Sequence, residues 1–238
     1  MKTKMNVKRL LAVSLAAMMT ATAFAGCGNS GGSSSDSKAD SASTGTPMTN
    51  EEIIKKAAAE GKIGNWGLGN EYEILALLQK YDLPTTYLSQ DFTMDGFDQD
   101  DITLASAMTF NELGLVINDY DGGYKYGDTV GTIDMNDEGV AMLEDNIFCT
   151  KEFAKNNPNT VKAFVYASMK GWKYAVENPE EAAQIVFDAG SSVSSDHQLY
   201  MAQQVAKLVS TDIKGNAVSV YGNMEEEEMQ QPLDQCKK

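Results

Sequence analysis

Apolar and polar residues alternate along the chain in a pattern that predicts short strands separated by amphipathic helices. The first helix begins at the capping box Thr49-x-x-Glu52 and ends at Gly61. A second apolar stripe at helical spacing follows Asn70, with Glu73 expected to complete its cap. Strands and helices in this order predict an α/β lobe with a mixed or parallel sheet. The expected strands are 62–66, 85–88, 102–107 and 129–135, and later helices are expected at 109–117 and from Pro158, Pro179 and Ser195.

The N-terminal segment has the pattern of a secretory signal. Four basic residues precede an apolar run from Leu10 to Ala25, which is too short, and too closely followed by Gly and Ser, to span a membrane as a helix. The run ends at Phe24-Ala25-Gly26-Cys27, which resembles the lipobox of bacterial lipoproteins with Phe24 in place of the usual Leu. We expect residues 1–26 to be a signal peptide and Cys27 to carry lipid, with ordinary cleavage after Ala25 as the alternative.

Residues 27–47 form a Gly/Ser-rich stretch without an apolar cluster, which is typical of a flexible tether. The folded body is therefore expected to begin at residue 48. Residues 48–135 carry the α/β pattern, and residues 136–238 are richer in helices.

The charge of the chain argues against nucleic acid as a partner. Lys and Arg together number 19 against 34 Asp and Glu, which gives a formal net charge of -15, and such a chain repels a polyanion. Removing the signal takes away four positive charges and no negative ones, which brings the net charge to -19. Arg9 is the only arginine, so a bound anion would depend on Lys, backbone N–H groups and helix N-termini. We expect no metal, because His197 is the only histidine and no Cys-x-x-Cys is present.

Three segments of the chain resemble a known family. They are Gly67–Glu73 (GLGNEYE), Ser106–Gly114 (SAMTFNELG) and Asn136–Asp145 (NDEGVAMLED). The resemblance covers about residues 61–232 and is to the solute-binding proteins of the thiamine-pyrimidine, riboflavin, sulfonate and nitrate group, which deliver small molecules to ABC importers. Within that group, the branch related to thiamine-pyrimidine synthases is the most similar.

The resemblance implies a type II periplasmic-binding-protein clamshell, in which two α/β lobes close on a ligand by hinge motion. In this chain lobe two is expected to be complete in residues 48–135. Residues 136–238 are expected to hold the crossing segment and the helical remainder of an incomplete lobe one.

The implied function is that of a lipoprotein on the outer side of the cell membrane, which captures a small heterocycle such as a thiamine pyrimidine precursor. Its partners would be an ABC permease and ATPase, and no cofactor is expected. A truncated, split or ligand-free fragment is the main alternative, and a sulfonate or nitrate binder and a pyrimidine synthase carry less weight. The synthases of this kinship use an active-site His and a Cys-rich motif, so a chain with one His and no Cys cluster is expected not to be an enzyme.

The candidate ligand residues follow strands 62–66 and 102–107, where ligands bind in open α/β sheets. Aromatic rings can stack on a flat heterocycle, and carboxylates accept hydrogen bonds from an aminopyrimidine. Structural roles compete, since Thr109 with Glu112 also matches a capping box and Glu71 also suits a helix N-terminus. We expect Trp172 in the core and His197 as a cap or packing residue. The candidates are Trp66, Gly69, Asn70, Glu71, Tyr72, Met108, Thr109, Asn111, Glu112 and Glu138.

Overall fold

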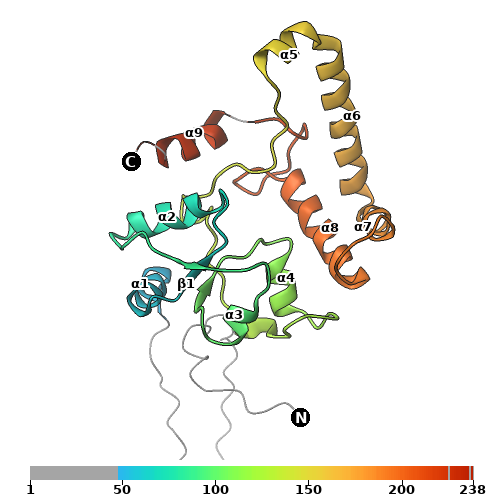
Figure 1. Cartoon of the computed structure of the whole chain (residues 1–238). Coiled ribbons are helices and arrows are strands. Elements are labelled where there is room, and N and C mark those ends of the chain that lie inside the picture. The colour runs from blue at the N-terminus through green and yellow to red at the C-terminus, as the bar shows by residue number, and fades with distance from the viewer. Residues whose placement is uncertain (1–47, 225, 236, 238) are drawn as a thin grey trace, which may run out of the picture.

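The computed structural model describes residues 48–224, 226–235 and 237. The predictions for the signal peptide, the lipidated Cys27 and the tether fall outside the described residues. Figure 1 shows a small sheet with α1 to α4 around it, and a group of helices, α6 to α8, on the other side of the molecule.

A parallel sheet of three short strands forms the centre of the first part, with the order β2-β1-β3. Gly64 of β1 (Ile63–Asn65) pairs with Leu88 of β2 (Leu88–Ser89), and Ile63 pairs with Leu104 of β3 (Leu104–Ala105). The prediction of a mixed α/β structure is therefore confirmed. The buried core joins α1, β1, α2 and the later segment 139–141, and its members are Ile54, Ala57, Ile63, Ile74, Leu77, Leu78 and Val140.

Helix α1 (Asn50–Glu60) forms as its sequence predicts. The Thr49 side chain accepts from the Glu52 backbone N–H, and the Glu52 carboxylate accepts from the Thr49 N–H at 2.8 Å. Gly61 ends the helix with φ 65°, a left-handed conformation that glycine adopts without a steric penalty. Helix α2 (Glu71–Lys80) then returns along the sheet after β1.

Three predicted elements differ in the structure. The strand expected at 85–88 is shifted, since β2 covers Leu88–Ser89 and shares only Leu88 with it. Residues 129–135 form no strand, and a short 3-10 helix, η2 (Gly127–Thr129), overlaps their start. Ile133 and Met135 instead pack against the core. Their apolar side chains are therefore partly buried although the segment forms no strand. Helix α4 (Glu112–Ile117) begins three residues later than predicted, because Asn111 rather than Thr109 takes the N-cap position.

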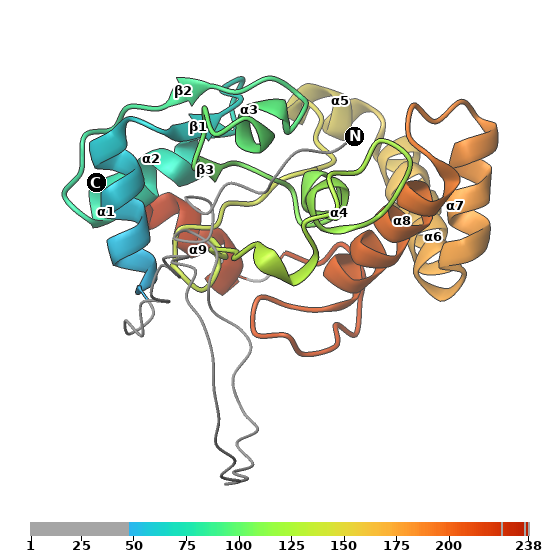
Figure 2. The same ribbon diagram turned by 90° about the horizontal axis from the view of Figure 1, so that it is seen from below.

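The helices of the second part follow the predicted starts closely. Pro158 and Pro179 occupy the first turns of α6 and α7, where a missing N–H costs nothing. Helices α6, α7 and α8 pack against one another, as Figure 2 shows from below. The prediction that Trp172 lies in the core is wrong, since its side chain is 41% exposed. The remaining elements are α3 (Asp95–Asp98), α5 (Lys151–Asn156), α6 (Pro158–Glu177), α7 (Pro179–Asp188), α8 (Ser195–Ser210) and α9 (Glu226–Gln235).

Gly64 at the centre of the sheet should not tolerate a side chain. A Cβ there would lie 2.6 Å from Ile102 Cδ1 and 2.8 Å from Gln90 Oε1. We expect Gly64→Ala to lower the free energy of unfolding by about 1–3 kcal/mol through overpacking, measured by urea unfolding followed by circular dichroism. Gly171→Ala is the control, because a Cβ at Gly171 in α6 meets no atom within 4 Å and alanine favours helix, so stability should rise by up to about 1 kcal/mol. Equal stability of Gly64→Ala and the wild type would contradict this packing.

Candidate functional site

The strand order places two of the predicted loops at one edge of the sheet. The chain leaves central β1 toward β2 on one side and then crosses to β3 on the other. The carboxyl ends of parallel strands at such a reversal form the usual ligand crevice of open α/β sheets. The β1–α2 loop (residues 66–70) and the β3–α4 loop (residues 106–111) both begin there. The candidates of 66–72 and those of 108–112 thus lie on or next to two loops that begin at the same edge of the sheet.

A buried asparagine connects these two loops. Asn65, with 2% of its side chain exposed, donates from Nδ2 to Ser106 Oγ at 2.9 Å and to the Asn70 carbonyl at 3.2 Å. Its Oδ1 accepts from the Gly67 N–H at 2.7 Å. The Ser106 hydroxyl also donates to the Gly64 carbonyl at 2.9 Å. One side chain therefore satisfies groups from both loops.

Gln90, which lies just after β2, connects β2 to the same network of hydrogen bonds. Its Nε2 donates to the Ser106 carbonyl at 2.8 Å, and its Oε1 accepts from the Ser106 N–H at 3.1 Å. Neither Gln90, Ser106 nor Asn65 was among the candidate residues. Their signal in the sequence is a polar residue at or next to the end of each strand, inside an otherwise apolar pattern.

The β1–α2 loop has an unusual backbone. Gly67, Leu68 and Gly69 all have positive φ, at 70°, 61° and 101°. The Gly69 N–H donates to Glu71 Oε2 at 2.7 Å, so this carboxylate already stabilises the loop. The Tyr72 side chain is 56% exposed beside it, which leaves its ring accessible for stacking.

Trp66 and Asn70 complete this loop. The Trp66 Nε1 atom is buried and has no hydrogen-bond partner among the described residues. Asn70 occupies the N-cap position of α2, but its side chain makes no capping hydrogen bond, so the predicted cap is wrong. Its expected partner Glu73 instead accepts from the Met142 N–H at 2.7 Å.

The β3–α4 loop is organised by the carboxylate of Glu112, which is 7% exposed. Its Oε2 accepts from the Met108 N–H and its Oε1 from Asn111 Nδ2, both at 2.9 Å. The capping box of Thr109 with Glu112, the structural role that competed with ligand binding, does not form, because Asn111 takes the N-cap position. The Thr109 carbonyl instead accepts from the Tyr200 hydroxyl at 2.8 Å.

Two carboxyl groups near the start of α2 have raised pKa values. Burial raises the pKa of Glu73, partly offset by the hydrogen bond from the Met142 N–H. Burial is also the main reason that the pKa of Glu144 is raised, and the negative charges of Glu73 and Asp145 add to the effect. The segment after residue 140 thus places the carboxyl group of Glu144 near Glu73 of α2.

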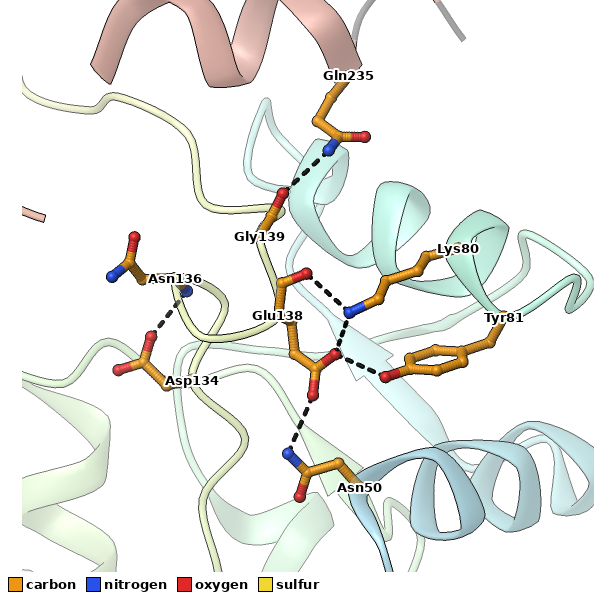
Figure 3. Close-up of polar contacts among 8 residues, drawn as sticks. All are labelled: Asn50, Lys80, Tyr81, Asp134, Asn136, Glu138, Gly139 and Gln235. Carbon is orange, nitrogen blue, oxygen red and sulfur yellow. Dashed lines mark hydrogen bonds and ion pairs between the residues drawn. The ribbon is translucent and has the colours of Figure 1, made fainter. Parts of the chain in front are cut away.

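Glu138 lies elsewhere, at the opposite end of α2 from the other candidates. Figure 3 shows its carboxylate accepting from Lys80 Nζ at 2.6 Å, from the Tyr81 hydroxyl at 2.6 Å and from Asn50 Nδ2 at 3.0 Å. The same Lys80 Nζ donates to the Glu138 carbonyl at 2.8 Å, and Gln235 of α9 donates to the Gly139 carbonyl at 3.0 Å. Hydrogen bonds from Lys80 and then Tyr81 lower the pKa of Glu138 to about 2. This geometry joins α1 and α2 to the segment that holds Glu138.

Other features of the described residues bear on the site. No helix among them is both long and apolar enough to cross a bilayer. They also contain no group of three His, Cys, Asp or Glu side chains that could hold a metal ion.

Cys149 is exposed with a free thiol. A shallow pocket of about 210 Å³, away from the candidate residues, is lined by Ala58, Gly61, Ile63, Thr86, Tyr87 and Leu88.

Comparison with known proteins gives one match. A protein-family model described as NMT1/THI5 like matches residues 55–182, which is more than half of the chain. The matched range includes all ten candidate ligand residues and ends within α7. No curated protein and no solved structure matches the chain.

Proposed function

The chain belongs to the NMT1/THI5-like family, and from this premise we propose that it is a solute-binding protein that captures a small heterocycle, such as a thiamine pyrimidine precursor, for an ABC importer. One observation carries the proposal. Asn65 connects the β1–α2 loop with the β3–α4 loop at the edge of the sheet where the strand order reverses. Preformed loops at this edge suit a small ligand, because a fixed wall needs no ordering when the ligand binds.

The groups at the crevice favour a ligand rich in hydrogen-bond donors. The Tyr72 ring is exposed for stacking, and Glu71, Glu73 and Glu144 supply carboxylate oxygens at or near the start of α2. An aminopyrimidine offers a flat ring and an exocyclic amine, which match these two kinds of group. The lack of arginine beyond Arg9 disfavours sulfonate and nitrate, which a guanidinium binds best.

The proposal includes the wider architecture. We assign residues 48–135 to lobe two of a type II clamshell, and residues 136–238 to the crossing segment and helices of lobe one. Residues 1–26 would direct export, and lipid on Cys27 would hold the protein at the outer side of the membrane, beside its permease and ATPase partners. We propose that the chain is not an enzyme, although the family also includes a pyrimidine synthase. Its one histidine, His197, is buried against Asn111, and a Cys cluster is absent from the sequence.

One observation favours a second candidate, a fragment that needs a partner before it can bind ligand. Apolar side chains of α6 are unusually exposed, with Phe164 at 61% and Trp172 at 41%. A helix whose apolar stripe stays open is expected when the element that should cover it is supplied by another chain.

The proposed ligand class can be tested by thermal shift and calorimetry on the mature protein. We expect 4-amino-5-hydroxymethyl-2-methylpyrimidine, at one hundred times its Kd, to raise Tm by roughly 5–10 °C. Riboflavin, taurine and nitrate should give smaller shifts. Tyr72→Ala should weaken pyrimidine binding about tenfold through lost stacking, and Tyr166→Ala, which removes another exposed tyrosine from α6, should not.

The outcomes separate the candidates. A shift with taurine or nitrate alone would contradict the pyrimidine assignment. If none of the four compounds shifts Tm, the fragment is favoured over the binding protein.

A further inference from the structure

Helix α8 contacts the crevice loop that follows β3, although the family match ends before this helix begins. Figures 1 and 2 both show α8 beside α4. Two side chains of α8 reach the loop. The Tyr200 hydroxyl donates to the Thr109 carbonyl at 2.8 Å, and His197 Nε2 lies 2.9 Å from Asn111 Oδ1.

The hydrogen-bond pattern determines the direction of the His197 contact. Glu112 Oε1 is an acceptor, so the Asn111 group that faces it is the NH₂. Asn111 therefore presents its oxygen to His197, and the imidazole must donate from Nε2. In the neutral ring Nδ1 is then the unprotonated nitrogen, and this atom is buried without a hydrogen-bond partner among the described residues. Burial lowers the pKa of His197, which favours this neutral form.

Close packing holds the two α8 side chains in place. The ring of His197, which is fully buried, stacks on Tyr200 with centroids 5.9 Å apart, and Tyr120 meets it edge-on at 5.5 Å. Tyr200 lies directly over Gly114 of α4, where a Cβ would come within 2.3 Å of Cε1. The Ser194 hydroxyl accepts from the His197 N–H and caps α8 at this point. The donors of His197 and Tyr200 therefore have little freedom to turn away from the loop.

We propose that His197 and Tyr200 are positioning residues, which hold the β3–α4 wall of the crevice in the shape that binds ligand. His197 orients Asn111, Asn111 orients the Glu112 carboxylate, and this carboxylate holds the Met108 N–H, while Tyr200 holds the Thr109 carbonyl. Through these contacts, α8 connects the packed group of helices α6, α7 and α8 with the ligand site. The effect on ligand rests on the proposed function, whereas the effect on the loop does not.

Amide hydrogen exchange on the ligand-free protein tests the positioning role directly. We expect His197→Phe, which keeps an aromatic ring but removes the donor, to speed exchange of the Met108 amide about five- to tenfold. His197→Gln, whose amide can donate to Asn111, should restore most of the protection. Tyr200→Phe should also speed exchange in the loop. Tyr174→Phe is its matched control, since it removes a hydroxyl that bonds Glu181 between α6 and α7, and loop exchange should not change.

Binding of the same pyrimidine supplies the second readout, and we expect it to weaken about five- to tenfold in His197→Phe and in Tyr200→Phe. Unchanged loop exchange in these two variants would overturn the proposal, whether or not ligand binds. Loss of protection in His197→Gln equal to that in His197→Phe would overturn the donor role of the imidazole. If His197→Phe does not fold, Tyr200→Phe against Tyr174→Phe decides. If the wild-type protein fails to bind the pyrimidine while the variants change loop exchange as expected, that result contradicts only the proposed function.

Discussion

Replacing Asn65 with leucine is expected to lower the free energy of unfolding by about 3 kcal/mol or more and to abolish binding at the crevice. The substitution keeps a side chain of similar size, so the loss would come from polar groups rather than from a cavity. Asn65 satisfies the Gly67 N–H, the Asn70 carbonyl and the Ser106 hydroxyl in a buried place. A buried donor or acceptor left without a partner costs about 1–3 kcal/mol. Urea unfolding at pH 7 and calorimetry with the pyrimidine measure the two effects.

A control for Asn65→Leu is the same change at Asn157. That residue is exposed and donates one hydrogen bond, to the Phe153 carbonyl at the end of α5. Asn157→Leu should cost less than about 1 kcal/mol and leave binding unchanged, because water can replace its partner. Asn65→Leu with stability within 1 kcal/mol of the wild type would mean that the network contributes little to the connection of the two loops.

Local rules predicted the first helix correctly, because its cap lies within its own first turn. Thr49 and Glu52 bond each other, so no distant residue can compete for them. The same rule failed at α2, where Glu73 accepts from the Met142 N–H, 69 residues away. A cap formed by neighbours is visible in the sequence, whereas a long-range contact that replaces it is not.

The shared edge of the two candidate loops could be predicted from the order of the strands. Residues after β1 and β3 share an edge because the strands are parallel, and that holds whatever the side chains are. The sequence does not identify Asn65, Ser106 and Gln90. A polar residue within or beside a strand only interrupts the apolar pattern, and its role becomes clear when its hydrogen-bond partners are known. The exposure of Trp172 has a related cause, since a stripe shows which face of a helix is apolar but not whether another element covers it.

Glu138 was predicted beside the ligand, and its position at the far end of α2 leads to a different expectation. We expect Glu138→Ala to lower the free energy of unfolding by about 3 kcal/mol at pH 7, measured by urea unfolding. The carboxylate accepts from Lys80, Tyr81 and Asn50, and the difference between its pKa of about 2 and the ordinary value of 4.5 corresponds to about 3 kcal/mol. The cost should not exceed this greatly, because Lys80 is 41% exposed and can turn to water.

The effect of Glu138→Ala should depend on pH in a defined direction. A carboxyl whose pKa is lowered by folding contributes its full stabilisation above its unfolded pKa of 4.5, and loses it as pH falls toward about 2. The stability gap between wild type and variant should therefore shrink by about 2 kcal/mol between pH 7 and pH 3. Glu177→Ala, which removes an exposed partner of Lys173 in α6, should cost less than about 0.5 kcal/mol at pH 7.

A gap that stays constant down to pH 3 would mean that the Glu138 side chain acts by packing, because a neutral contribution does not titrate. A gap that closes identifies the charge as the link between three segments that are distant in the sequence. Asn50 begins α1, Lys80 and Tyr81 end α2, and Glu138 lies two residues before Val140, which is part of the core. Because Val140 is buried against the same two helices, losing the Glu138 carboxylate should release the segment that carries Met142 to Glu73, and so disturb the crevice from the opposite end of α2.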